Sequence, residues 1–193
     1  MSTAQPTIVT RRLRADAVRN RAKVLEAARA AFGEHGAGAQ MEDVARRAGV
    51  GVGTVYRHFP TKQALAEALV EARFDDTIAF VRELSEQERD PWRALVRTFE
   101  HCAATQEQDR AWAGALASMA GGTLVGPREH QIGELLAIEE QLIARAKAAG
   151  VVREDLAAAD MPALFCGLAS VVQAGVAWRR YLDLLLDGLR PPR

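Results

Sequence analysis

A very short predicted helix carries an unusual number of hydrogen-bond donors. Side chains of this kind can bond to phosphate oxygens or to the edges of bases. Packing of the turn is the alternative role, but so many donors have little structural use on so short a helix. The pattern therefore favours contact with nucleic acid. The donors are Thr54, Tyr56, Arg57 and His58, followed closely by Lys62.

Glycines and a proline define the ends of this short helix. Gly49, Gly51 and Gly53 let one helix end, the chain turn and a second helix begin within about one helical turn. Pro60 ends the second helix because the residue before a proline avoids helical angles. A short, donor-rich helix that follows another at a sharp angle is typical of a helix-turn-helix, which inserts its second helix into the major groove.

Two longer helices are predicted to precede this short helix in the sequence. Apolar residues at helical spacing predict a scaffold helix over 16–35, which Gly36 ends. The same spacing predicts a second helix over 41–48, whose outer face carries Arg46 and Arg47. These two helices would hold the donor-rich helix in place, which gives a three-helix unit.

Charge is distributed unevenly, although the whole chain is neutral. Residues 1–62 hold 11 basic and 5 acidic side chains, and the remainder holds 14 basic and 20 acidic ones. Residues 1–14 lack an apolar period and are predicted to be a disordered basic arm. Its Arg11, Arg12 and Arg14 would be either solvated or in contact with phosphate or the minor groove. A basic first part suits a partner rich in phosphate.

The run from Val24 to Leu65 resembles the DNA-binding domain of TetR-type transcriptional regulators. It spans about the first third of the chain, and its spacing is a specific signature. The family usually has Thr or Ser near the start of the second helix, where this chain has Ala39 and Gln40. A hydroxyl cap with a phosphate contact is therefore not expected there. The signature residues are Phe32, Gly36, Ala45, Gly49, Val50, Thr54, Tyr56, Phe59 and Lys62.

The resemblance implies which side chains contact DNA. Tyr56 and Lys62 would bind phosphates, and Arg57 is suited to a bidentate contact with guanine worth about 1–3 kcal/mol of discrimination. Val52 stands where a polar residue is common and offers only apolar contact, for instance to a thymine methyl. The implied DNA-binding residues are Val52, Gly53, Thr54, Tyr56, Arg57, His58, Lys62, Arg46 and Arg47.

The rest of the chain also reads as helical, with no strand pattern or repeat. The fold is therefore predicted to be all-α, with an N-terminal three-helix helix-turn-helix DNA-binding domain over 15–62 and a C-terminal helical bundle over 63–193. Thr61 and Asp90 are predicted helix caps, and Asp160 is a third. The further helices are predicted at 61–87, 92–105, 110–120, 128–149, 160–173 and 178–187.

No arrangement of residues in the chain predicts catalysis. The histidines are scattered, and neither a Walker motif, an HExxH motif nor a GxSxG motif occurs. Cys102 and Cys166 lie far apart without a CxxC pair, so a disulfide framework or a zinc site is not indicated. A redox role for them is disfavoured because no cation lies near either in sequence. We expect no enzyme, no catalytic residue, no metal and no cofactor.

The resemblance to the TetR-type regulators implies that the C-terminal helices enclose an effector pocket and pair two subunits. Ordinary core filling is the alternative for the pocket candidates. The last two helices hold more apolar surface than a terminal helix of a monomer covers, which favours a homodimer. The ligand-binding candidates are His101, Cys102, Trp112, Met119, Cys166 and Gln173. The dimer candidates are Tyr181, Leu182, Leu185 and Leu189.

The sequence thus predicts a ligand-responsive regulator, more a repressor than an activator. As a dimer it would bind a palindromic double-stranded operator and be released by a small, largely apolar effector. The alternative is a DNA-binding protein with a filled, ligandless body that acts through protein partners. An enzyme would need a convergent nucleophile and base, which the sequence lacks.

A cytoplasmic location is expected. No basic, apolar pattern of a signal peptide opens the chain. Met161 to Trp178 is uncharged over 18 residues, which is close to the length of a membrane span. Pro162, Ser170 and Gln173 lie within it together with small residues, so a helix buried in protein is expected instead.

Overall fold

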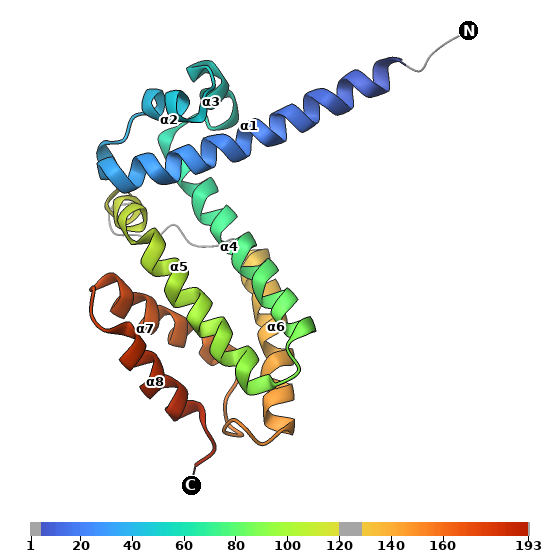
Figure 1. The fold of residues 1–193 in the computed structure, drawn as a ribbon, viewed down its shortest axis with the longest axis vertical. Helices are drawn as coiled ribbons and strands as arrows, with labels where there is room; N and C mark the ends of the chain where they lie inside the picture. The colour runs from blue at the N-terminus through green and yellow to red at the C-terminus, as the bar shows by residue number, and fades with distance from the viewer. Residues whose placement is uncertain (1–4, 120–128, 193) are drawn as a thin grey trace. The chain divides into compact units, whose positions relative to one another are not determined.

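The structure, a computed structural model, describes residues 5–119 and 129–192, with side chains described over 16–109 and 129–192. Within these ranges the chain is helical and forms no strand, which confirms the all-α prediction (Figure 1). The α-helices are α1 (Gln5–His35), α2 (Met41–Ala48), α3 (Val52–His58), α4 (Lys62–Gln87), α5 (Pro91–Met119), α6 (Glu129–Ala148), α7 (Met161–Gln173) and α8 (Trp178–Leu189). Short 3₁₀ turns, η1 (Gly36–Gly38) and η2 (Ala158–Asp160), precede α2 and α7.

The described residues divide into two compact units. We call residues 5–70 the head, and we call Glu71–Arg110 together with 129–192 the body. The end of α5, from Ala111 on, groups with the head. The predicted domain boundary at 62/63 falls at the start of α4, whereas the compact units divide within α4, after Val70.

The head packs α1, α2, α3 and the start of α4 around one apolar core. Val24, Ala28 and Phe32 supply the face of α1 at helical spacing, and each is at most 1% exposed. Val44 from α2 and Val55 from α3 are buried against the same core. Figure 1 shows α2 and α3 beside the C-terminal part of α1. These contacts fix the orientation of the short α3.

The body packs α5, α6, α7 and α8 with the later part of α4. Phe99 and Leu142 are fully buried at its centre, and α7 and α8 lie side by side (Figure 1). Gln131 of α6 donates to the carbonyl of Glu71 at 3.1 Å and to Asp75 at 2.5 Å, which joins α6 to α4. No helix in the described part of the chain has the length and apolarity that crossing a membrane requires.

Arg145 of α6 joins these helices at the other end, where α4 ends. Its guanidinium donates to the carbonyls of Ser85 and Glu88, each at 2.7 Å, so it serves as a cap for α4. The last carbonyls of a helix have no partner within the helix, so the charged donor satisfies them.

Arg145→Ala is expected to lower the free energy of unfolding by about 2 kcal/mol, because two charge-assisted hydrogen bonds are lost. Thermal unfolding followed by circular dichroism would show this as a fall in Tm of about 4–8 °C. Lys147→Ala, two residues further along α6, is the control and is expected to leave Tm nearly unchanged. An equal effect of both substitutions would show that the cap is not what stabilises this end of the body.

Two of the predicted caps are confirmed and one is wrong. The amide of Ala64 donates to Thr61 Oγ1 at 3.0 Å at the start of α4. The amide of Trp92 donates to Asp90 Oδ1 at 2.9 Å, and Pro91 opens α5 as expected. The carboxylate of Asp160 makes no cap bond to α7. It accepts from the amide of Ala157 at 2.8 Å and so closes the preceding 3₁₀ turn.

Three helices of the structure differ from the predicted bounds by more than one residue at an end. α1 begins at Gln5 rather than at residue 16, so the arm that was predicted to be disordered is helical from Gln5 on. Pro6 is compatible with this helix because it lies in the first turn, where its missing N–H removes no helical hydrogen bond. α5 is one helix where the sequence predicted two, because its polar middle contains no Gly or Pro to break it. α8 runs through Gly188 to Leu189, which is buried and holds the helix end.

Candidate nucleic-acid interface and body cavity

The turn between α2 and α3 depends on Gly49. This residue has φ +66°, a left-handed conformation that glycine adopts without strain. Its amide donates to the carbonyl of Arg46 at 3.3 Å, and the amide of Val50 donates to that of Ala45 at 3.1 Å. These bonds satisfy the end of α2 and direct the chain into α3.

α3 keeps one side in the core and turns the rest outward. Val55 is 0% exposed, and Phe59, which follows the helix, is 3% exposed. Tyr56 is 44% exposed and Val52 is 41% exposed. Large hydrophobic side chains such as these are usually covered, so their exposure on one short helix is notable. Gly53 and Arg57 are exposed as well, and Thr54 and His58 are half-buried. The predicted groove-facing residues thus share the uncovered side of one anchored helix.

Lys62, predicted to contact phosphate, has a partner within the head. Its Nζ donates to the carbonyl of Ala37 in η1 and lies 5.7 Å from the centre of the Phe32 ring. These contacts tie the start of α4 to the turn that follows α1. Phosphate contact by Lys62 stays a prediction.

The two arginines of α2 are likewise engaged in ion pairs. Arg46 pairs with Asp43, and Arg47 forms a two-pronged contact with Glu34 of α1, with Nη1 to Oε1 at 2.9 Å. The hydrogen bond from Arg47 lowers the pKa of Glu34 below its ordinary value. α2 has no side-chain cap, and Gln40 instead donates to the carbonyl of Gly38 at 2.8 Å. DNA contact by Arg46 and Arg47 also stays a prediction.

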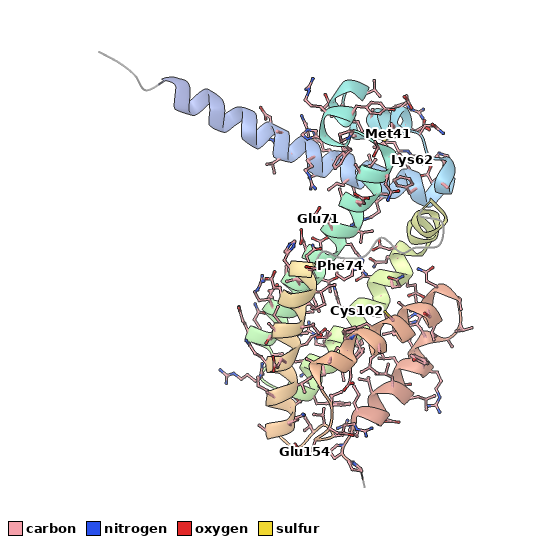
Figure 2. All side chains as sticks on the ribbon, turned by 180° about the vertical axis from the view of Figure 1, so that it is seen from behind. Met41, Lys62, Glu71, Phe74, Cys102 and Glu154 are labelled. Atoms are coloured by element: carbon pink, nitrogen blue, oxygen red, sulfur yellow. The ribbon has the colours of Figure 1, made fainter. Side chains whose placement is uncertain are left out.

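The body contains a cavity of about 220 Å³ between its helices. Its wall is mainly apolar but includes two threonines, an arginine and a glutamate. Figure 2 labels Phe74 on α4 and Cys102 on α5, which line it from neighbouring helices. The lining residues are Arg73, Phe74, Thr77, Val81, Thr98, Cys102, Ala103, Gln106, Leu135, Glu139, Phe165, Cys166, Leu168 and Ala169.

A buried ion pair lies in this wall. The side chains of Arg73 and Asp109 are 14% and 8% exposed, and Arg73 Nε lies 2.7 Å from Asp109 Oδ2 without the alignment of a hydrogen bond. Arg73 also donates from Nη1 to Thr77 Oγ1 at 2.9 Å. The pair joins α4 to α5 and balances the charge of the arginine.

Glu139 and Cys102 also line the cavity, and burial acts on both. Glu139 is 2% exposed, and desolvation raises the pKa of its carboxyl to about 8. Desolvation raises the pKa of the Cys102 thiol to about 12. Both groups therefore hold their protons at neutral pH, which leaves Cys102 unreactive.

The structure brings two of the six predicted ligand-binding residues to the cavity, Cys102 and Cys166. His101 stacks on Phe80, with ring centres 3.7 Å apart, and is not in the lining; burial lowers its pKa. Gln173 is half-buried and is also not in the lining. Trp112 and Met119 lie outside the residues whose side chains are described.

Sequence reasoning missed the two charged residues of the wall, Arg73 and Glu139. A signal for Glu139 was available, because it falls on the apolar stripe of α6 between Leu135 and Leu142. A glutamate at a core position is rare unless it is paired or functional. No group of residues suited to holding a metal ion occurs among the side chains that the structure describes.

The predicted dimer candidates on α8 fall into two classes. Leu182 and Leu189 are 4% and 5% exposed, because they pack into the core of the body itself, and their place in a dimer interface stays a prediction. Tyr181 and Leu185 are half-buried. The outward side of α8 instead carries Leu184, which is 54% exposed.

Comparisons with known proteins match both units. Residues 24–69 match the family described as bacterial regulatory proteins, tetR family, and residues 90–191 match the C-terminal domain of SbtR-like transcriptional regulators. A solved TetR transcription regulatory protein from Mycobacterium vanbaalenii is 37% identical, covers 92% of this chain and 99% of its own, and superposes with a TM-score of 0.69. A TetR transcriptional regulator from Streptomyces coelicolor is 34% identical, with coverage of 90% and 99% and a TM-score of 0.67.

A curated relative is the A-factor receptor protein of Streptomyces griseus, which is 33% identical over 115 residues. That match spans 58% of this chain and 40% of the relative, so less than half of the relative's length is covered. The match to the SbtR-like C-terminal domain family alone covers more than half of this chain. The Mycobacterium protein is matched along nearly the whole length of that protein. The chain therefore belongs to the tetR family of bacterial regulatory proteins, whose members are DNA-binding transcriptional regulators and not enzymes.

Proposed function

We propose that the protein is a dimeric repressor that binds a palindromic operator through α3 and is released by a small effector in the body cavity. The cavity carries this proposal. Its wall includes Phe74 and Thr77 of α4, the helix whose first residue, Lys62, follows α3 by a few residues. A ligand that prefers one conformer of the body would therefore act on a helix that continues into the head.

The outward sides of α7 and α8 are the proposed dimer face. Leu184 is exposed there, and Ala163 and Ser170 are small exposed residues of α7. Small side chains let two helices approach closely, so the same pair of helices in a second copy would form a four-helix interface. A two-fold dimer would space two α3 helices about 34–36 Å apart, which suits adjacent major grooves.

Two observations favour an effector over a ligandless body. The cavity of about 220 Å³ is larger than the voids that ordinary core packing leaves. One relative is named as a receptor for A-factor. Because its proposed target is chromosomal DNA, we place the action of this protein in the cytoplasm.

The test is release of DNA by cavity ligands. Fluorescence anisotropy of a complex with labelled operator DNA would be measured against a library of small apolar compounds. We expect some compounds to lower the anisotropy in wild type. Ala169→Phe, which fills the cavity from α7, is expected to keep DNA binding and to lose the response. Ala137→Phe on the exposed side of α6 is the matched control.

An unchanged response of the Ala169→Phe protein would place the effector elsewhere. If binding to DNA is retained but no compound releases it, the ligandless body with protein partners becomes the better account.

A further inference from the structure

One buried acid in the cavity wall has no partner. Glu139 lies on α6 and is 2% exposed, and among the described residues its Oε1 is buried without a hydrogen-bond partner. A buried polar group without a partner costs free energy. Because this group lies in the wall of a cavity, a ligand is the natural source of the missing partner.

The two threonines of the wall offer a ligand hydrogen-bond acceptors. The hydroxyl of Thr98 donates to the carbonyl of Ala94 at 2.9 Å, and that of Thr77 donates to the carbonyl of Arg73 at 3.0 Å. Since these hydrogens are used, only oxygen lone pairs remain for a ligand. Arg73, which has donors, is held by Asp109 and Thr77. The half-buried amide of Gln106 can donate or accept. The threonine hydroxyls and the unpaired oxygen of Glu139 therefore favour a ligand that donates hydrogen bonds at this part of the wall.

The charges that face Glu139 also favour a cation. From α4 comes Arg73, which Asp109 of α5 balances. From α5 comes Cys102, whose thiol stays protonated because burial raises its pKa to about 12, and from α7 comes Cys166. Arg73, the cation of the described lining, is balanced by Asp109, so the negative charge of an ionised Glu139 would be balanced by a positively charged ligand.

The shape and apolar part of the cavity define the rest of the ligand. Phe74 and Phe165 line it from α4 and α7, and aromatic rings attract cations placed over their faces. Its volume of about 220 Å³ exceeds the roughly 150 Å³ of an engineered cavity that binds benzene, and it is below the range of drug-sized sites. One ring with a short chain is the size that fits.

We propose that the cavity binds a small organic cation, a protonated amine on an apolar body of about one aromatic ring, with Glu139 as its counter-ion. This assignment rests on the proposed function, since it names the ligand class of the effector cavity. The ammonium group enters with its proton, and the carboxyl of Glu139 releases its own proton to the solvent. One proton is thus released for each cation bound while the free protein holds Glu139 neutral.

Isothermal titration calorimetry with 2-phenylethylamine tests this, with the uncharged 2-phenylethanol as the matched compound. Burial raises the pKa of Glu139 to about 8. The affinity for the amine is therefore expected to rise about tenfold per pH unit from pH 6 towards pH 8 and then to level off. At pH 7, buffers of different ionisation enthalpy are expected to reveal release of about one proton. The affinity for 2-phenylethanol is expected not to rise.

Glu139→Gln keeps the shape of the side chain and removes its charge. It is expected to weaken amine binding at least tenfold at about pH 8, to remove the pH dependence, and to leave 2-phenylethanol binding unchanged. Glu140→Gln, at the exposed neighbouring position, is the matched control and is expected to behave as wild type.

The stability of the variant gives a second readout. The pKa of Glu139 is about 8 in the folded chain and 4.5 as its ordinary value, so between these pH values the folded state holds a proton that the unfolded state lacks. Stability of wild type therefore falls as pH rises through this window, with an unfolding constant that changes by up to about tenfold per pH unit. Glu139→Gln is expected to flatten this dependence and to unfold at no lower temperature.

Three results would overturn the proposal. Equal affinity for the amine and the alcohol at every pH would show a cavity that ignores charge. Unchanged amine binding by Glu139→Gln would remove its role as counter-ion. Absence of binding by both compounds would exclude this ligand class. None of the three decides whether other compounds release DNA, which the anisotropy experiment measures separately.

Discussion

Asp109→Ala is expected to lower the free energy of unfolding by about 3–5 kcal/mol. The substitution leaves Arg73 in the body wall without its carboxylate, and both side chains are largely buried. A buried charge that loses its partner keeps its desolvation penalty and loses the attraction that offset it. For a chain of this size the fall in Tm would be about 6–20 °C, measured by calorimetry or circular dichroism.

An exposed ion pair of the same type provides the control. Arg82 and Glu134 join α4 to α6, and their side chains are 47% and 44% exposed. Glu134→Ala is expected to cost at most about 1 kcal/mol, because solvent screens such a pair. Replacing Arg73 and Asp109 together by apolar residues is expected to recover most of the loss. Equal effects of Asp109→Ala and Glu134→Ala would show that burial does not make the Arg73–Asp109 pair more important than an exposed ion pair.

Arg57→Ala is expected to weaken binding to the preferred DNA sequence by about 10- to 100-fold. Arg57 is exposed on α3, next to Tyr56, and a bidentate contact with guanine is worth about 1–3 kcal/mol. Because that contact reads a base, affinity for random DNA is expected to change little. Tyr56→Ala is expected instead to weaken both alike, since a phosphate contact carries no sequence information. Anisotropy titrations with both DNAs measure the difference.

Removal of one positive charge from the protein needs its own control. Arg97 is exposed on α5 in the body, so Arg97→Ala removes the same charge at a distance from α3 along the chain. It is expected to leave affinity for both DNAs nearly unchanged. If Arg97→Ala and Arg57→Ala have the same effect, Arg57 acts only through total charge and does not read a base.

Most of the fold could be predicted because local signals define it. The range of α2 and the ends of α3 follow from Gly49 and Pro60, and Thr61 and Asp90 cap the helices that follow them. Such glycine, proline and cap signals act within a few residues, so a single sequence contains them.

The predictions that failed depend on contacts distant in sequence. The helix break expected near Asp109 is absent, and this polar residue is buried because Arg73 pairs with it across two helices. The sequence also did not show that Leu182 and Leu189 pack into the core of the body, and their place in a dimer interface stays a prediction. Apolar periodicity shows that a face is covered but does not show by what.

The candidate sites were predictable to different degrees. The exposed side of α3 followed from the spacing of its donors, since Val55 is the one apolar anchor in the middle of that helix. The cavity was predicted only through Cys102 and Cys166. Glu139 was overlooked because charged residues are usually solvated, and only its position on a buried stripe indicates otherwise.

Specific DNA binding through α3 is the central claim, and one measurement tests it most directly. Labelled DNA from upstream of the protein's own gene would be titrated with wild type and with Tyr56→Ala at two salt concentrations. We predict that wild type binds this DNA tightly and that the binding weakens as salt rises. Random DNA of equal length is expected not to compete for the protein, and the Tyr56→Ala protein is expected to bind far more weakly. Equal competition by random DNA, together with unchanged binding by Tyr56→Ala, would contradict the account.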